Sequence, residues 1–173
     1  MGYIPNPLNQ FDTYTYNIEI YMVRPSDSAD YEQNISRGSA IPIMDNVTEA
    51  RYNITNLEFI SYTGFYPTRN QVQGTFNFTV YEQNGVTLLS KIKESAAALG
   101  IPNHTQAHYI VRIRFNGRDP SGAARTHQDV FTYALLFTKF TFQVDEQGTT
   151  YQIEGYENTS AGYQYINLSL IHI

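Results

Sequence analysis

From Thr75 to Asp119 the sequence reads TFNFTVYEQNGVTLLSKIKESAAALGIPNHTQAHYIVRIRFNGRD, and this segment is the most informative about the fold. Residues 75–80 alternate polar and apolar side chains, which is the period of a half-buried β-strand. After Gly85 the apolar residues recur every three or four positions, which predicts one amphipathic helix over residues 87–99. The apolar positions of this helix are Leu88, Leu89, Ile92, Ala96 and Leu99.

The ends of the predicted helix carry their own signals. Thr87 is a residue type that caps a helix start, and Gly100 followed by Pro102 is typical of a helix end. A second alternating strand follows over residues 109–115. A single helix lying across an antiparallel sheet is a scaffold, and no residue in it has a pattern suited to catalysis.

The rest of the chain reads almost wholly as β-structure. Residues 14–22 alternate cleanly, residues 52–62 do so less cleanly, and Pro42 makes residues 40–44 a short edge strand or a turn. In residues 131–144 the alternating apolar side chains change from one face of the strand to the other. A strand can make this change only with an extra residue, which predicts a β-bulge near Thr138-Lys139. A bend of that kind lets one strand serve two sheets that pack almost at right angles.

We therefore predict a β-dominated α+β fold, with two packed antiparallel sheets in a barrel-like or orthogonal sandwich and one flanking helix. Residues 1–13, with Pro5 and Pro7, are expected to form an extended N-terminal arm. Residues 14–167 are expected to form a single domain. The last six residues, LSLIHI (168–173), translate the sequencing-adapter DNA CTGTCTCTTATACACATC, so we interpret them as adapter-derived and the chain as truncated.

The composition favours broad, weakly charged surfaces. Charged residues make up 16% of the 173 residues, well below the roughly 25% usual for globular domains. The chain has 15 tyrosines, and tyrosine gives a large contact area with few rotatable bonds. These properties suit permanent packing against neighbouring subunits, and they suit monomeric lectin-like modules equally well.

The charge and the reactive residues exclude several functions. A net charge of −5 argues against general affinity for nucleic acids or anionic membranes, and the absence of cysteine excludes disulfides and thiolate chemistry. No segment approaches the length of a membrane-spanning helix. His104 and His108 have a metal-ligand spacing only for a helix, and here they fall in a loop, while the acidic residues lie at turns that they cap. We expect no enzyme activity, no metal and no cofactor.

The run FTVYEQNGVTLLSKIKESAAALGIPNHTQAHYIVRIRFNGRDPSG resembles a recurrent segment in structural proteins of tailed bacteriophages, particularly baseplate and hub components. The flanking stretches over residues 54–78 and 135–157 are similar to the hairpins on either side of that segment. Altogether the resemblance covers about residues 6–160. The positions that carry it are Glu82, Gly85, Leu99-Gly100, Phe115, Gly117, Asp119 and Gly122.

This resemblance implies a domain like those of tail tubes and hubs, in which subunits form rings around a channel and extend their sheets into neighbours. It implies a structural role in the virion tail, with copies of the chain and other tail or baseplate proteins as partners. The protein would be made in the bacterial host cytoplasm. It implies neither specific nucleic-acid recognition nor membrane insertion.

Two sets of candidate contact residues follow. For assembly we select the exposed polar loop over residues 65–74 and the N-terminal arm. For the alternative function, a carbohydrate-binding β-domain, aromatic rings beside the same loop would stack on sugars. The assembly candidates are Phe65, Tyr66, Arg69, Asn70, Phe11 and Tyr3, and the glycan-stacking candidates are Tyr62, Phe65 and Tyr66.

Overall fold

The protein is represented by a computed structural model that describes residues 7–63, 72–126 and 130–157. The described chain forms one eight-stranded sheet in the order β2-β1-β5-β7-β8-β4-β3, and β6 pairs with β5. Every strand pair is antiparallel. The strands are β1 (Thr13–Val23), β2 (Ile41–Asp45), β3 (Tyr52–Thr63), β4 (Val72–Gln83), β5 (His108–Arg118), β6 (Ala124–Thr126), β7 (Phe131–Val144) and β8 (Gly148–Glu157). The helices are α1 (Tyr31–Ser36) and α2 (Thr87–Ala98), with the 3-10 helices η1 (Pro7–Gln10), η2 (Pro25–Asp30) and η3 (His104–Gln106).

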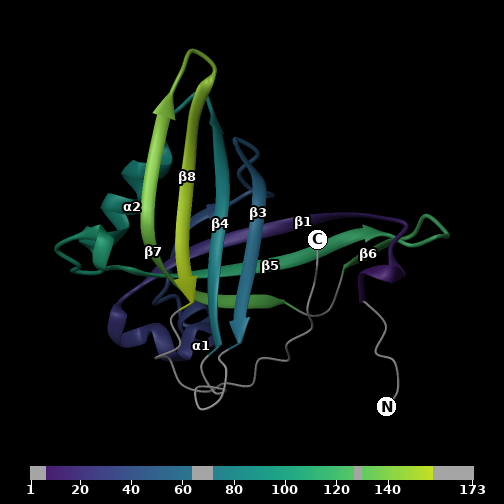
Figure 1. Ribbon diagram of the computed structural model, residues 1–173, viewed down its shortest axis with the longest axis horizontal. Helices are drawn as coiled ribbons and strands as arrows, with labels where there is room; N and C mark the ends of the chain where they lie inside the picture. The colour runs from purple at the N-terminus through teal and green to yellow at the C-terminus, as the bar shows by residue number, and fades with distance from the viewer. Residues whose placement is uncertain (1–6, 64–71, 127–129, 158–173) are drawn as a thin grey trace.

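The sheet bends so that its two halves cross. In Figure 1, β7, β8, β4 and β3 stand side by side, while β1 and β5 run across them at a steep angle. β7 belongs to both halves, because residues 131–135 pair with β5 and residues 135–144 pair with β8. The prediction of a β-dominated fold with crossed antiparallel layers is confirmed, except that the layers are two halves of one sheet. That sheet is not closed into a barrel, because its order ends at β2 and β3.

The predicted bulge in β7 is confirmed. The pairing of β7 with β8 shifts register between Phe137 and Lys139, which leaves Thr138 as the extra residue. Phe137 stacks on Tyr109 of β5 with ring centroids 3.8 Å apart, and Phe140 packs on Tyr151 of β8 at 5.6 Å. The bulge therefore keeps apolar side chains on the core face on both sides of the bend.

α2 also lies where the sequence predicts a helix. Its buried face consists of Leu88, Ile92, Ser95 and Ala96, and the chain leaves the helix at Gly100 with a φ of 71°. This left-handed conformation explains the glycine at the helix end. The start differs from the expected Thr87 cap, because Val86 occupies the capping position and makes no side-chain capping bond.

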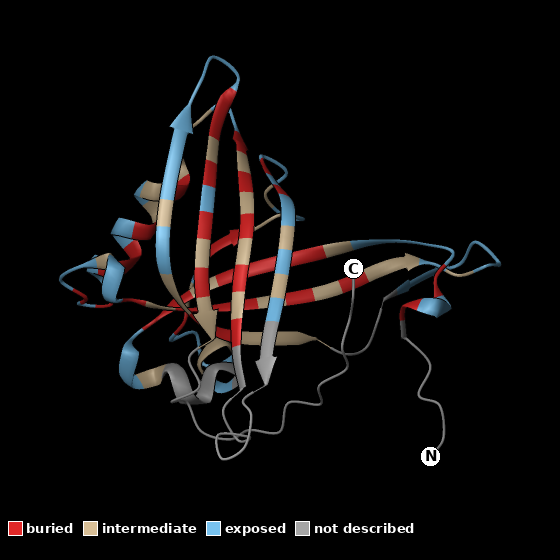
Figure 2. Ribbon diagram, viewed as in Figure 1, coloured by how far each residue is buried: buried red, intermediate tan, exposed pale blue. Residues whose placement is uncertain are grey.

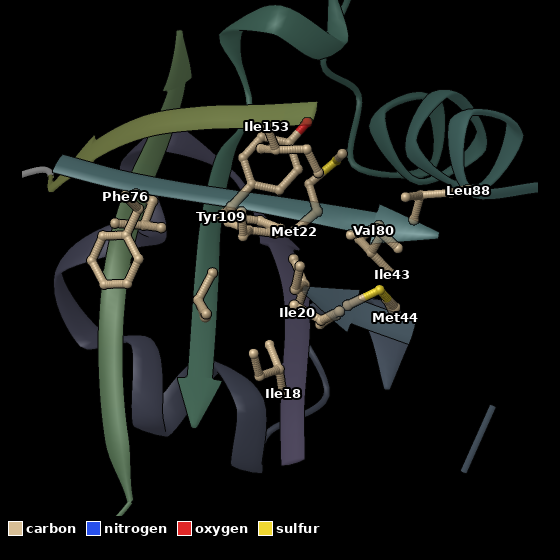
Figure 3. Close-up of a cluster of buried hydrophobic side chains, with 14 of the residues drawn as sticks. Ile18, Ile20, Met22, Ile43, Met44, Phe76, Val80, Leu88, Tyr109 and Ile153 are labelled. Carbon is tan, nitrogen blue, oxygen red and sulfur yellow. The ribbon is translucent and has the colours of Figure 1, made fainter. Parts of the chain in front are cut away.

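The core lies between the crossing halves of the sheet and the buried face of α2. Figure 3 shows side chains of β1, β2, β4 and α2 meeting there. Several of them are almost wholly buried, among them Ile18, Ile20, Met22, Ile43, Met44, Phe76, Val80 and Leu88. Burying this apolar area is the main favourable term for the fold.

The N-terminal segment differs from the expected extended arm wherever the structure describes it. Residues 7–10 form η1, and Leu8 and Phe11 are buried in the core cluster. The ring of Phe11 lies over Gly117, where an added Cβ would come within 2.7 Å of the ring. The Asp12 amide donates to the Arg118 carbonyl at 2.8 Å, so the segment is fixed to the end of β5. Two apolar side chains and this bond outweigh the polar composition of the segment.

Candidate functional site

Most of the residues selected for assembly or glycan contacts lie outside the described part of the chain. These are Tyr3, Phe65, Tyr66, Arg69 and Asn70. The backbone of Tyr62 belongs to β3, but its side chain is also outside the description. Phe11 is 8% exposed and packs within its own chain. The described residues therefore place no predicted contact residue on the surface.

The structure offers a different surface, the open edge of the sheet at β7. Within the described ranges, residues 136–144 pair with β8 on one side and with no strand on the other. We call this segment the β7 edge. At the opposite end of the same half, β3 likewise has β4 as its only described strand neighbour. Unpaired edge strands present backbone N–H and C=O groups that can pair with another strand.

Apolar side chains accompany the β7 edge. Phe142 and Val144 are 49% and 54% exposed, and Val86, just before α2, is 40% exposed. Phe142 and Phe140 both contact the ring of Tyr151, which is fully buried, so they lie on the core face of the sheet. We call Phe140, Phe142 and Val144 the β7 strip. The strip extends the core face toward an exposed strand end, and Figure 2 shows β7 changing from tan to pale blue toward that end.

The edge strands carry little protection against pairing. Natural edge strands often hold lysines, prolines or inward-pointing charges that prevent pairing with other chains. Residues 136–144 contain no proline and a single charged side chain, Lys139, which forms an ion pair with Glu154. β3 likewise contains no proline and only Glu58 as a charged residue. By contrast, the edge strand β2 contains Pro42. The β7 and β3 edges are thus the ones suited to strand pairing.

A buried carboxylate fixes the helix beside this surface. Glu82, at the end of β4, accepts hydrogen bonds from the Thr87 amide at 2.8 Å, the Leu88 amide at 3.1 Å and the Tyr151 hydroxyl at 2.8 Å. It also accepts a bond from the Thr87 hydroxyl. Glu82 therefore satisfies two of the free amides at the start of α2 and ties the helix to β4 and β8. The sequence indicated that Glu82 caps backbone amides at a turn, and its reach to Tyr151 required the strand order.

The ionised form of Glu82 is favoured in the folded protein. Burial raises the pKa of this carboxyl, but the hydrogen bonds from Thr87, Leu88 and Tyr151 outweigh burial and hold the pKa below its usual range. The folded state then binds fewer protons than the unfolded state. The stabilisation by Glu82 is complete above the unfolded-state pKa and is lost as the pH falls through the folded-state pKa.

We predict a matching pH dependence. The difference in unfolding free energy between the wild type and Glu82→Gln is expected to be largest near neutral pH and to shrink below about pH 4. Urea denaturation of both proteins at several pH values measures this difference. A gap that stays constant down to pH 3 would show that the charge of Glu82 does not stabilise the fold.

The other charged clusters are explained within the chain. Glu19 of β1 is 7% exposed and forms ion pairs with Arg112 and Arg114 of β5, each at 3.3 Å. Arg125 pairs with Asp119 at 2.9 Å in the β5–β6 hairpin. These three arginines thus have acidic partners in their own chain, and Arg118 donates to the Gly122 carbonyl at 2.8 Å.

The described residues also bear on metals and membranes. No group of three or more His, Cys, Asp or Glu side chains within them is arranged to hold a metal ion. None of the helices in the described ranges has the length and apolar character needed to cross a bilayer.

The fold and the open edges together define a β-dominated domain built on a bent, unclosed sheet. No family model matches the chain, and no curated protein matches it. Among solved structures, it is similar to a chain of a PdpA-VgrG complex in a lidless form, with a TM-score of 0.39 and 12% identity over 85% of this chain and 20% of that chain. A chain of the Francisella PdpA-VgrG complex in a half-lidded form gives 0.40 and 12% over 87% and 18%. The chain thus spans about a fifth of the length of these chains.

One functional prediction follows from the exposed strip. Phe142→Lys places a charge on the β7 edge at a side chain that is 49% exposed, so we expect a change in stability below about 1 kcal/mol. Because edge lysines oppose strand pairing, we expect any concentration-dependent association to weaken. Sedimentation velocity of both proteins measures this, with Gln152→Lys on the interior strand β8 as the control. Equal effects of the two lysines would argue against the β7 edge as a contact surface.

Proposed function

We propose that this chain is a structural component of a bacteriophage tail, at the baseplate or hub, and that it acts by packing against copies of itself and other tail proteins. In this proposal the chain performs no catalysis and takes no cofactor. Its place is the virion tail, where domains of this kind surround a channel.

The observation that carries the proposal is the open sheet at β7 and β3. The half of the sheet formed by β7, β8, β4 and β3 is not closed, so among the described residues it has an unpaired edge at β7 and another at β3. The exposed β7 strip adds apolar area beside the β7 edge. Exposed apolar area next to an unpaired strand favours association with another protein. The low share of charged residues suits a permanent interface, in which charges would have to be desolvated.

The sequence resemblance supplies the kind of assembly. The segment from Thr75 to Asp119 that carries it folds as β4, α2 and β5 in the predicted order. β5 pairs with residues 131–135 of β7, and β4 pairs with β8, the neighbour of the β7 edge. The residues that resemble tail proteins therefore help to position the candidate contact surface.

Two measurements test this function. A long sequencing read through the source locus is expected to place the gene among tail and baseplate genes. Antibodies against the chain are then expected to label the tails of the corresponding particles in electron micrographs. Neighbouring genes for carbohydrate metabolism, or particles whose tails are not labelled, would contradict the proposal.

A further inference from the structure

We infer that the occupant of the β7 edge is the β3 strand of a second copy of this chain, paired head to tail so that the sheet continues from one copy into the next. This inference rests on the proposed function and names the two strands and the register of the contact. Three features of the described residues lead to it: strand direction, charge, and the match of side-chain rows.

Strand direction permits this pairing. β7 is antiparallel to β8, β8 to β4, and β4 to β3, so β7 and β3 of one copy run in opposite directions. A second copy that is placed beside the first in the same orientation therefore presents β3 antiparallel to β7. The same core face points inward in both copies, and the hydrogen-bond pattern of an antiparallel ladder continues.

Charge selects the partner strand. Lys139 and Glu58 are the only charged residues of the β7 edge and of β3, respectively, and both are exposed. A symmetric contact between two β7 edges would offer Lys139 no carboxylate, because residues 136–144 contain no acidic side chain. Pairing with β3 supplies one, and opposite charges on neighbouring strands favour pairing.

The rows of side chains set the register. Cross-strand partners place Glu58 and Lys139 in one row on the face away from the core, so an unstaggered continuation brings Lys139 beside Glu58 of the next copy. Within the chain, Lys139 contacts Glu154 at 2.5 Å, and Glu58 accepts a bond from Asn77 at 3.4 Å. The row consists of Glu58, Asn77, Glu154 and Lys139.

The adjacent rows fit the same register. On the core face, Phe142 ends a row that begins with Ile54, so the continued sheet places Ile54 of the next copy beside the exposed ring of Phe142. On the opposite face, Thr141 ends a row that begins with Thr55. The register therefore pairs apolar with apolar and polar with polar side chains.

Cysteine cross-linking tests this contact sharply, because the chain contains no cysteine. Thr55→Cys and Thr141→Cys change exposed residues of one row on the two edge strands. Within one copy, two intervening strands separate these positions by roughly 14 Å, which exceeds the ~7 Å limit for a disulfide between Cα atoms. Any disulfide between them must therefore join two copies. Gln152→Cys, in the same row but on the interior strand β8, is the matched control.

We expect an equal mixture of the Thr55→Cys and Thr141→Cys proteins to form a disulfide-linked dimer under mild oxidation, in at least about tenfold excess over mixtures that contain Gln152→Cys. Lys139→Glu should lower the yield about two- to fivefold, and adding Glu58→Lys should restore it. Dimers of Thr141→Cys alone, in equal yield, would show a symmetric β7 contact and overturn the inference. The absence of the mixed dimer would also overturn the inference.

The outcomes separate this inference from the proposed function. If the wild type self-associates without this cross-link, only the inference fails. If the wild type does not self-associate and its gene lies outside a tail locus, the proposed function fails too.

Discussion

Replacing Glu82 with alanine is expected to destabilise the protein by about 3–5 kcal/mol, because the change leaves several buried donors without an acceptor. Glu82 is fully buried, and its carboxylate accepts bonds from the Thr87 and Leu88 amides and from the Tyr151 hydroxyl. Removal leaves the start of α2 uncapped and takes the Glu82 acceptor away from the buried Tyr151 hydroxyl. The helix then loses its attachment to β4 and β8.

Urea denaturation monitored by circular dichroism measures this loss. Glu82→Gln keeps an acceptor oxygen and is expected to fall between the alanine variant and the wild type. The control is Glu94→Ala on α2, an exposed carboxylate whose removal should cost less than about 0.5 kcal/mol. If Glu82→Ala and Glu94→Ala lay within 1 kcal/mol of each other, the stabilising role of the buried carboxylate would be refuted.

The second large effect is expected at Phe76, where alanine should cost about 3–5 kcal/mol. The side chain has no exposed area and lies at the centre of an aromatic cluster. Its ring centroid is 4.5 Å from that of Phe59 in β3 and 4.7 Å from that of Tyr133 in β7. Truncation opens a cavity between β3 and β7, the two outer strands of the half of the sheet formed by β7, β8, β4 and β3.

Phe142→Ala is the matched control, because the same substitution at a half-exposed ring should cost less than about 1 kcal/mol. The two variants should also separate folding from association. Phe76→Ala lowers the unfolding free energy, whereas Phe142→Ala leaves it nearly unchanged and weakens association. Equal destabilisation by both would mean that the β7 strip belongs to the core of the single chain.

Local patterns predicted much of this fold. The helix over 87–99, its end at Gly100 and the bulge near Thr138-Lys139 each follow from a periodicity or a residue preference within a few positions. For the same reason the strand over 109–115 could be assigned from its alternation. These features depend on sequence neighbours alone, so the sequence contains the information that they need.

The candidate contact surface could not be predicted from local patterns, because it depends on strand order. Phe140, Phe142 and Val144 alternate as core residues do, and the pattern does not show that residues 136–144 lie at an edge. The burial of Phe11 likewise depends on the approach of residues 7–11 to Gly117, which is more than one hundred positions away in the sequence. The polar composition of this segment predicted an exposed arm, but the long-range contact with Gly117 buries Phe11.

Hydrogen exchange of the β7 edge at low and high protein concentration shows whether another copy pairs with the open sheet. If another copy pairs with this edge, the amides of residues 136–144 and of β3 should exchange more slowly in the concentrated sample, while those of β4 exchange equally in both. Slower exchange confined to the two edge strands is the result that we predict. Equal exchange at the β7 edge in both samples, with the protein monomeric throughout, would contradict assembly through the open sheet.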